Sequence, residues 1–420
     1  MLAEDAARLD KQESHRLLLM SLIRKSLLLL IVSGLAACSS APPQQPEMPV
    51  APPVGSVPPQ PPAAVPVAPQ PWPAPSASLR PTTFAALPGW DADDLRAAWP
   101  AFLASCAALK ARPEWASVCF RAQSVGAGST AAIRRFFEAG FVPYRVVNPD
   151  GTVEGMVTGY YEPLLHGARK RGGRYQTPLY GVPADLLAID VSGPYPELKG
   201  QQLRGRLVGN KVVAYPARAE LLASGALAGK EILWVDDPID AFFLQVQGSG
   251  RVQLADDNEV VRLSYADQNG WPYKSIGRYL IDKGELTPDQ ASMQGIKAWA
   301  AAHPAQVRAL LNANPRYVFF REEKIDDPAV GPTGALGVPL TPERSIAVDP
   351  RYVPLGAPVF LATTRPGSAI PMRRLVLAQD TGSAIKGAVR ADYFWGFGDQ
   401  AGDLAGRMKQ RGAMWVLLPK

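Results

Sequence analysis

The chain has 420 residues, with 44 lysines and arginines against 38 aspartates and glutamates, which gives a formal net charge of +6. This charge is modest and the basic residues form no cluster, so a nucleic-acid-binding function is not expected. The three histidines, His15, His166 and His303, lack the spacing of a metal site or of a cysteine–histidine pair. We therefore expect neither metal nor cofactor, and we expect any catalysis to depend on carboxylates.

The amino-terminal residues 1–38 have the composition of a secretory signal. Arg24 and Lys25 precede an apolar run at 27–32, which is too short to span a bilayer, and small residues follow it. We predict that this segment directs export. Met20 is a candidate for the true start, because the residues before it add nothing that such a signal needs.

The signal ends in the sequence Leu-Ala-Ala-Cys, which is similar to a bacterial lipobox. This similarity implies that Cys38 becomes the lipidated first residue of the mature protein. Ser39 follows it, whereas an aspartate there often retains lipoproteins at the inner membrane, so we expect an anchor in the outer membrane, facing the periplasm. A cleaved signal followed by an ordinary cysteine is the alternative.

Residues 39–84 form a predicted linker. The stretch 41–83 consists mainly of proline, alanine and valine and has almost no charge. This composition favours an extended, disordered tether with polyproline character. The remaining chain, from residue 85 to the end, is long enough for two domains with cores of their own.

Two cysteines, Cys106 and Cys119, lie in the predicted folded part. Export to an oxidising compartment favours a disulfide between them, which would stabilise the fold by about 3 kcal/mol in the chain-entropy model. Two buried free thiols are the alternative. A catalytic cysteine is not expected, since no histidine is suitably spaced.

The first folded elements are predicted to be helices. Apolar residues recur at helical spacing between 91 and 110, although Pro100 is expected to break or kink this helix. A second helix is predicted at 130–140. The pattern then changes to strands at 141–147 and 152–161, which are separated by a turn.

The segment 163–314 mixes helical and strand patterns and is predicted to be an inserted domain. Within it, Thr287-Pro288-Asp289-Gln290 is a capping-box sequence, which predicts that a helix starts there. Beyond it, the predicted elements are strands at 316–320, 345–348, 358–362, 374–379 and 414–418 and a helix at 399–411. Strands on both sides of the insert predict one mainly β domain, formed by 85–162 and 315–420.

Three aspartates, Asp349, Asp380 and Asp392, stand in short polar motifs between strand-like hydrophobic runs. A carboxylate that ends a buried strand can be desolvated, which raises its pKa and lets it hold a proton near neutral pH. Acid catalysis on a glycosidic bond requires such a group. The last eighty residues of the chain are therefore the strongest candidate for a catalytic region.

These motifs and five further segments, in the same order, resemble the membrane-bound lytic murein transglycosylase A (MltA) family with its three-aspartate (3D) domain. The five segments are 157–163 (VTGYYEP), 240–250 (DAFFLQVQGSG), 264–270 (SYADQNG), 275–284 (SIGRYLIDKG) and 314–320 (NPRYVFF). The resemblance implies a double-psi β-barrel interrupted by a smaller mixed α/β domain. Ser383 departs from the pattern, since many relatives have glycine there.

The resemblance also implies a peptidoglycan lytic exotransglycosylase, a lyase acting on a carbon–oxygen bond. Such an enzyme breaks the β-1,4 bond between N-acetylmuramic acid and N-acetylglucosamine and forms 1,6-anhydromuramoyl ends. We expect a monomer that acts on glycan strands, with cell-wall synthesis complexes as candidate partners. Two alternatives remain open: a peptidoglycan hydrolase that uses a second carboxylate and water, and a non-catalytic wall-binding lipoprotein.

Asp392 is the predicted general acid and base, because the family's acid lies in this third motif. The neighbouring Tyr393 and Trp395 are expected to exclude water and to stack on sugar rings. The alternative is a surface aspartate paired with Arg390.

The other two aspartates have lesser predicted roles. Asp380 is expected to support catalysis, with shaping of its Asp-Thr-Gly turn as the alternative. Asp349 precedes a proline at the end of a strand, so we expect it to be structural.

Four residues outside the aspartate motifs are predicted to bind substrate. The resemblance implies that Thr158 and Tyr161 bond sugar hydroxyls near the cleaved linkage, with Tyr160 in the core. Gln247 and Ser249 lie in a glycine-flanked polar loop, which would let the backbone approach a glycan closely. A simple hairpin connection is the alternative for this loop.

Overall fold

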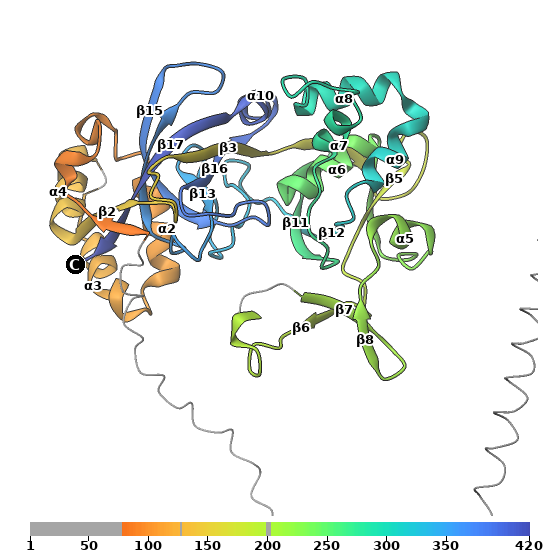
Figure 1. The fold of residues 1–420 in the computed structure, drawn as a ribbon, viewed down its shortest axis with the longest axis horizontal. Coiled ribbons are helices and arrows are strands. Elements are labelled where there is room, and N and C mark those ends of the chain that lie inside the picture. Colours follow the sequence, from red (N-terminus) through yellow and green to blue (C-terminus); the bar gives the residue numbers. More distant parts are fainter. Residues whose placement is uncertain (1–77, 127, 199–202) are drawn as a thin grey trace, which may run out of the picture. The chain divides into compact units, whose positions relative to one another are not determined.

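The computed structural model describes residues 78–126, 128–198 and 203–420 (Figure 1). The predicted signal, Cys38 and most of the predicted linker lie outside these ranges. Within them, no helix has the length and apolar character needed to cross a membrane. The described fold begins earlier than the predicted linker boundary at residue 84, because β1 (Leu79–Pro81) pairs antiparallel with β2 (Phe141–Val146) and Leu79 is buried.

The first sheet closes into a ring. Besides β1 and β2, its strands are β3 (Gly155–Glu162), β13 (Ser345–Val348), β14 (Pro358–Thr364), β15 (Pro371–Asp380), β16 (Arg390–Phe397) and β17 (Lys409–Pro419). The pairings run β17–β14–β15–β13–β16–β3 and return to β17. The strand β17 closes the ring because its first residues pair with β3 and later ones with β14. Most of the predicted strands after 340 are confirmed.

Three helices pack on this barrel through one large apolar core. They are α2 (Trp99–Leu109), α3 (Pro113–Ala122) and α4 (Thr130–Gly140), preceded by short 3-10 turns at Phe84–Ala86 and Trp90–Ala92. Pro100 opens α2 and does not break it, since a proline in the first turn loses no helical hydrogen bond. A disulfide joins Cys106 to Cys119, as the export prediction favoured. It connects α2 to α3.

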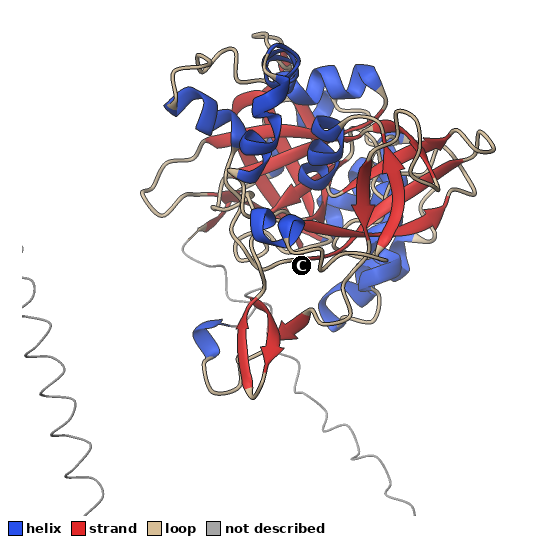
Figure 2. Cartoon of the chain, turned by 90° about the vertical axis from the view of Figure 1, so that its right-hand side faces the viewer, coloured by secondary structure: helices blue, strands red, loops and turns tan. Residues whose placement is uncertain are grey.

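The inserted segment contains two further sheets (Figure 2). The larger has β4 (Leu164–Ala168), β5 (Thr177–Tyr180), β9 (Glu231–Val235), β10 (Ser249–Leu254), β11 (Val260–Gln268) and β12 (Val318–Lys324). The smaller has β6 (Leu187–Ile189), β7 (Leu203–Val208) and β8 (Lys211–Ala214). Because β12 pairs with β11, the strand predicted at 316–320 belongs to the insert, and the predicted boundary at 314 is too early.

Helices accompany the larger inserted sheet, and one more packs on the barrel. They are α5 (Arg218–Ala223), α6 (Pro238–Gln247), α7 (Ile276–Asp282), α8 (Met293–Ala302), α9 (Val307–Asn312) and, after β16, α10 (Asp399–Arg407), with 3-10 turns at Pro196–Leu198 and Pro304–Gln306. The helix predicted to start at Thr287 starts later. Gln290 reaches back to the Thr287 amide, but Ser292 caps α8 by accepting from the Gly295 amide.

Glu162, the last residue of β3, connects the barrel strand to the inserted sheet. Its side chain is 0% exposed and accepts hydrogen bonds from Arg251 Nε at 2.8 Å and from Arg262 Nε at 2.6 Å. Both arginines lie on strands of the larger inserted sheet. A buried carboxylate needs such partners, so this cluster sets the position of the end of β3.

Candidate active site

Three neighbouring strands position Asp392. On β16 it lies opposite Thr158 of the parallel strand β3 and opposite Ala347 of the antiparallel strand β13. Side chains alternate along a strand, so Ala391 and Tyr393 point away from the face that carries Asp392. The carboxyl group is partly buried. A central strand therefore fixes this side chain more rigidly than a loop would.

The Thr158 hydroxyl donates a hydrogen bond to Asp392 Oδ1 at 2.6 Å. Within the described part of the chain this is the one hydrogen bond that the carboxyl group makes. The second oxygen, Oδ2, accepts no hydrogen bond from the described residues. Burial raises the pKa of Asp392 above its ordinary value, although the Thr158 hydrogen bond and the charge of Arg390 oppose the shift.

The alternative interpretation of Asp392, a surface residue paired with Arg390, does not fit the contacts. Arg390 donates to the backbone carbonyls of Met156 and Ala391. Burial lowers the pKa of Arg390, whose charge acts on Asp392 without a direct hydrogen bond. Asp392 is thus a partly buried acid held by a hydroxyl group.

Asp380 lies at the end of β15 and is a second acid of the same site. Its Oδ2 accepts from the Tyr160 hydroxyl and its Oδ1 from the Ala335 amide, each at 3.0 Å. Burial raises the pKa of Asp380 to about 6, and the charge of Asp392 adds to the rise. Hydrogen bonds from Thr381, Ala335 and Tyr160 act against it. Near neutral pH this group therefore changes its protonation state.

One strand, β3, holds both acids. Thr158 and Tyr160 are two residues apart and project from the same face of the strand. Tyr160 was expected to be a core residue, and it does pack against Phe394 with ring centroids 5.2 Å apart. The sequence analysis missed its second contact, to Asp380. Its alternation with Thr158 was the signal that could have revealed it.

Asp349 has the contacts of a structural residue. It is 1% exposed and pairs with Arg351 Nη2 at 2.6 Å, and it accepts from the Gly387 amide at 2.9 Å. Burial alone would raise the pKa of Asp349, but the hydrogen bonds from Arg351 and Gly387 outweigh it and hold the pKa below the ordinary value. An ionised group that fixes a loop in this way is not a proton donor.

Two family models match the chain, the MltA specific insert domain at residues 156–321 and the 3D domain at residues 344–418. Membrane-bound lytic murein transglycosylase A of Escherichia coli K12 is 34% identical over 297 residues, which cover 69% of this chain and 72% of that protein. The chain belongs to the MltA family.

Solved structures of the family agree with this membership. A lytic transglycosylase, LtgG, of Burkholderia pseudomallei is 54% identical, with a TM-score of 0.56 over 82% of this chain and 96% of that one. E. coli MltA with bound chitohexaose is 28% identical, with a TM-score of 0.60 over 76% of this chain and 90% of that one. The mixed, mostly β fold of this chain is the MltA fold.

The prediction that Tyr393 and Trp395 stack on sugar rings is wrong for this member of the MltA family. Tyr393 is 0% exposed and donates its hydroxyl hydrogen to the Glu343 carbonyl at 2.6 Å. Trp395 is 5% exposed, and its indole nitrogen lies 3.2 Å from Met408 Sδ. Both side chains are on the core side of β16, opposite Asp392, because side chains alternate along a strand. They stabilise the barrel and are not available to a sugar.

The segment around Gln247 and Ser249 is a helix-to-strand junction, so the alternative interpretation of it as a simple hairpin connection is wrong. Gln247 ends α6, Gly248 caps it with a φ of 84°, and Ser249 begins β10. The Gln247 side-chain oxygen accepts from the Tyr161 amide at 3.2 Å. This contact ties α6 to the strand that holds both acids.

Tyr161 is partly buried beside α10, where its ring approaches Gly402. Its hydroxyl lies 3.6 Å from Met293 Sδ. Burial raises the pKa of Tyr161 to about 12, so it stays a neutral hydrogen-bond donor. Among the described residues, no group of three or more histidines, cysteines or acids is arranged to hold a metal ion.

Proposed function

We propose that this protein is a lytic transglycosylase that breaks the β-1,4 bond between N-acetylmuramic acid and N-acetylglucosamine in peptidoglycan. The observation that carries the proposal is the Asp392 carboxyl group, whose Oδ1 is bonded to Thr158 and whose pKa burial raises. The names of the relatives, lytic murein transglycosylases, give the substrate class. The chitohexaose bound to E. coli MltA supports a glycan strand as the ligand.

In the first step, protonated Asp392 donates its proton from Oδ2 to the oxygen that leaves with N-acetylglucosamine. The bond between C1 of the muramoyl residue and this oxygen breaks, and C1 gains oxocarbenium character. Raising the pKa of Asp392 increases the fraction of enzyme that carries the proton near neutral pH. Thr158 keeps the carboxyl group in one orientation while the proton is transferred.

In the second step, the C6 hydroxyl of the same muramoyl residue attacks C1, and the Asp392 carboxylate takes the proton of that hydroxyl. The new C6–O–C1 bond gives the 1,6-anhydro end, and the acid returns to its starting form. No water is consumed. An intramolecular nucleophile is favoured because it loses no translational freedom.

Asp380 is the second carboxylate that the alternative reaction, hydrolysis, would use. A hydrolase would need a second carboxylate free to activate water. The two oxygens of Asp380 already accept hydrogen bonds from Ala335 and Tyr160. We assign Asp380 a supporting role, in which its negative charge favours the protonated state of Asp392 and the developing positive charge at C1.

The proposal extends to the type of barrel, the substrate contacts, the membrane anchor and the partners of the protein. The closed ring of strands, with parallel pairs β13–β15 and β16–β3, supports a double-psi barrel. Thr158, Tyr161, Gln247 and Ser249 remain proposed substrate contacts beside the acids. The names of the relatives support membrane association, and we propose a monomer anchored in the outer membrane through Cys38 and facing the periplasm. Cell-wall synthesis complexes are the proposed partners.

The test is digestion of purified peptidoglycan by the wild type, by Asp392→Asn and by the control Asp326→Asn, which changes an exposed acid. We expect mass spectrometry to find anhydro ends from the wild type and the control, and a loss of at least about 100-fold for Asp392→Asn. Reducing ends one water heavier would instead identify a hydrolase. Equal cutting by all three proteins would refute the assignment of the acid, and no cutting by any would favour a non-catalytic wall binder.

A further inference from the structure

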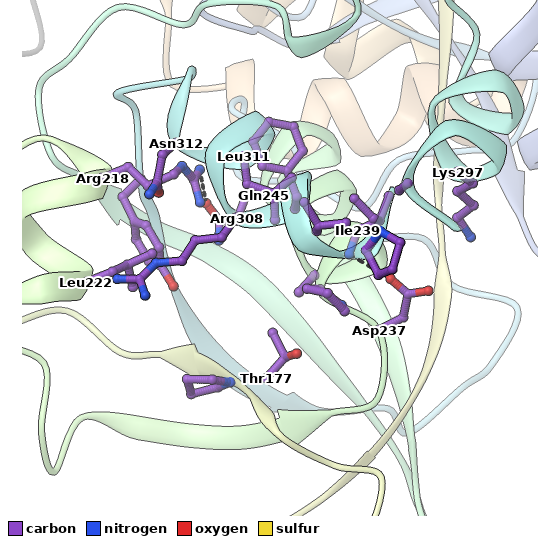
Figure 3. Close-up of a pocket in the computed structure, with 18 of the residues that line it drawn as sticks. Thr177, Arg218, Leu222, Asp237, Ile239, Gln245, Lys297, Arg308, Leu311 and Asn312 are labelled. Carbon is purple, nitrogen blue, oxygen red and sulfur yellow. Dashed lines mark hydrogen bonds between the residues drawn. The ribbon is translucent and has the colours of Figure 1, made fainter. Parts of the chain in front are cut away.

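A pocket of about 570 Å³ lies within the inserted segment (Figure 3), and neither Asp380 nor Asp392 is among the residues that line it. Its walls come from β5, α5, α6, α8 and α9, and they include none of the residues placed around Asp392. Leu222, Ile239, Phe242 and Leu311 make much of this wall apolar. This volume is in the range that binds small molecules or short peptides.

Arg218 is the one side chain of the wall that is both charged and almost completely buried, at 3% exposure. Its Nη2 donates to Gln245 Oε1 and to the Arg316 carbonyl, each at 2.6 Å, and its Nε donates to the Asn314 carbonyl at 3.0 Å. All three acceptors are uncharged. Within the described residues no carboxylate pairs with this guanidinium group, and its Nη1 makes no hydrogen bond there.

The positively charged guanidinium group of Arg218 also lies against two aromatic rings. The guanidinium carbon lies 4.9 Å from the ring centroid of Phe242 and 4.8 Å from that of Tyr317. Burial lowers the pKa of Arg218 to about 10, so the group remains cationic at neutral pH. A buried cation without an anionic partner is costly, and an anion entering the pocket would offset that cost.

The charges at the other side of the pocket are already compensated. Asp237 accepts from the amides of Ile239 and Asp240 at the start of α6, and Lys297 pairs with Asp240. Figure 3 shows Asp237 and Lys297 apart from Arg218.

Arg308 lies on the Arg218 side of the same pocket (Figure 3). It is exposed and has no ion pair in the part of the chain that the structure describes. The pocket therefore has a cationic end, formed by two arginines, and an apolar body.

We propose that this pocket binds the free carboxylate end of a short peptide with small apolar side chains, and that this peptide is the stem peptide of peptidoglycan. The identification of the peptide rests on the proposed function, because the proposed substrate carries such stems. The carboxylate bonds to Arg218 Nη1 and Arg308, and the methyl groups contact the apolar wall. The size of the pocket favours a few residues of peptide over a folded protein partner.

Calorimetry with N-acetyl-D-alanyl-D-alanine and its carboxyl-terminal amide tests this proposal on the purified protein. We expect the free acid to bind at least about tenfold more tightly than the amide, since the amide lacks the charge that faces the arginines. Ala301→Trp, at an exposed part of the wall, should fill the pocket and abolish binding. Arg308→Ala should weaken binding about fivefold, because one of two cationic contacts is lost.

Arg278→Ala is the matched control, since this exposed arginine lies on α7, outside the pocket, and should bind as the wild type does. Ala301→Trp should still cleave peptide-free glycan, whereas Asp392→Asn should bind the dipeptide but not cleave, so the two proposals fail separately. Equal binding of acid and amide, or unchanged binding by Ala301→Trp, would overturn the proposal. If N-acetyl-L-alanyl-L-alanine bound more tightly than N-acetyl-D-alanyl-D-alanine, the identification of the ligand as the stem peptide would be overturned. The carboxyl terminus of a protein would then be the favoured ligand.

Discussion

Thr158 donates a 2.6 Å hydrogen bond to Asp392 across the parallel pairing of β3 and β16. Because a hydroxyl donor stabilises the ionised carboxylate more than the neutral acid, this bond lowers the pKa of Asp392 against the effect of burial. The same bond occupies Oδ1 and so leaves Oδ2 as the oxygen that we propose to face the substrate. The pairing register of β3 with β16 therefore influences both the pKa of Asp392 and the orientation of its carboxyl group.

Thr158→Val, which keeps the shape of the side chain but removes the hydroxyl, should shift the pH dependence of catalysis. We expect the alkaline limb of kcat/KM to move up by about one pH unit, because the carboxylate loses a hydrogen bond. We also expect kcat to fall about tenfold, because the carboxyl group loses its fixed orientation. Peptidoglycan digestion followed between pH 4 and pH 9 measures both effects. Thr158→Ser should restore the wild-type profile, and an alkaline limb that stays in place would contradict this role.

Asp380 should make the protein less stable as the pH rises. Its folded pKa is about 6 against an ordinary value of 3.8, so the folded protein binds this proton more tightly than the unfolded chain does. The contribution is complete below pH 3.8 and is lost as the pH rises through 6. It amounts to about 3 kcal/mol of unfolding free energy.

Asp380→Asn should remove most of this dependence. Urea unfolding at several values between pH 4 and pH 8, with the disulfide intact, measures it. The exposed Asp326→Asn is the control and should retain the wild-type slope. A slope shared by all three proteins would show that Asp380 does not titrate between the folded and unfolded states in this way.

Gly159 lies between Thr158 and Tyr160 and should not tolerate a side chain. A Cβ atom there would be 2.7 Å from Trp395 Nε1 and 2.9 Å from the Ala405 Cα atom. We expect Gly159→Ala to lower the unfolding free energy by about 1–3 kcal/mol, because β3 or its neighbours must shift. Activity should fall as well, since β3 holds both acids.

Thermal unfolding and digestion assays measure the two effects of Gly159→Ala. Gly193→Ala is the control, because no atom lies within 4 Å of the added Cβ there. If the two variants unfolded at the same temperature and kept full activity, the close packing of β3 against Trp395 would not matter to the site.

The sequence predicts Asp392 and Asp380 as the acids of the site, and this stays a prediction, whereas the residues that surround them could be predicted only in part. Asp380 stands out because it ends a hydrophobic run that forms β15, whereas Asp392, which the sequence places after a strand-like run, is the third residue of β16. The roles of Tyr393 and Trp395 were misjudged because a local motif does not show which face of β16 is turned to the core. That face depends on pairing with β3 and β13, which are distant in sequence.

The wrong prediction of where the inserted domain ends has a similar physical origin. The strand β12 was assigned to the barrel because it follows the inserted helices, yet it pairs with β11. A strand's own composition does not specify its partner. The contact between Tyr160 and Asp380 likewise joins residues 220 positions apart, which no local pattern reports.

The buried ion pairs of Glu162 give the last prediction. Glu162→Gln would leave Arg251 and Arg262 facing a neutral side chain in a site from which water is largely excluded. Removing one partner from a buried ionic cluster typically costs about 3–5 kcal/mol, whereas an exposed pair contributes about 1 kcal/mol or less. We expect Glu162→Gln to lower the unfolding free energy by the larger amount. Activity should fall too, because Glu162 ends the strand that carries Thr158 and Tyr160.

The matched control is Glu322→Gln, which breaks the more exposed pair with Arg169. Urea unfolding of both variants compares the two environments directly. A loss of less than about 1 kcal/mol for Glu162→Gln would mean that the neighbouring carbonyl of Val330, which also accepts from Arg262, is a sufficient partner. In that case the end of β3 would be held by strand pairing alone, and the activity of the variant should equal that of the wild type.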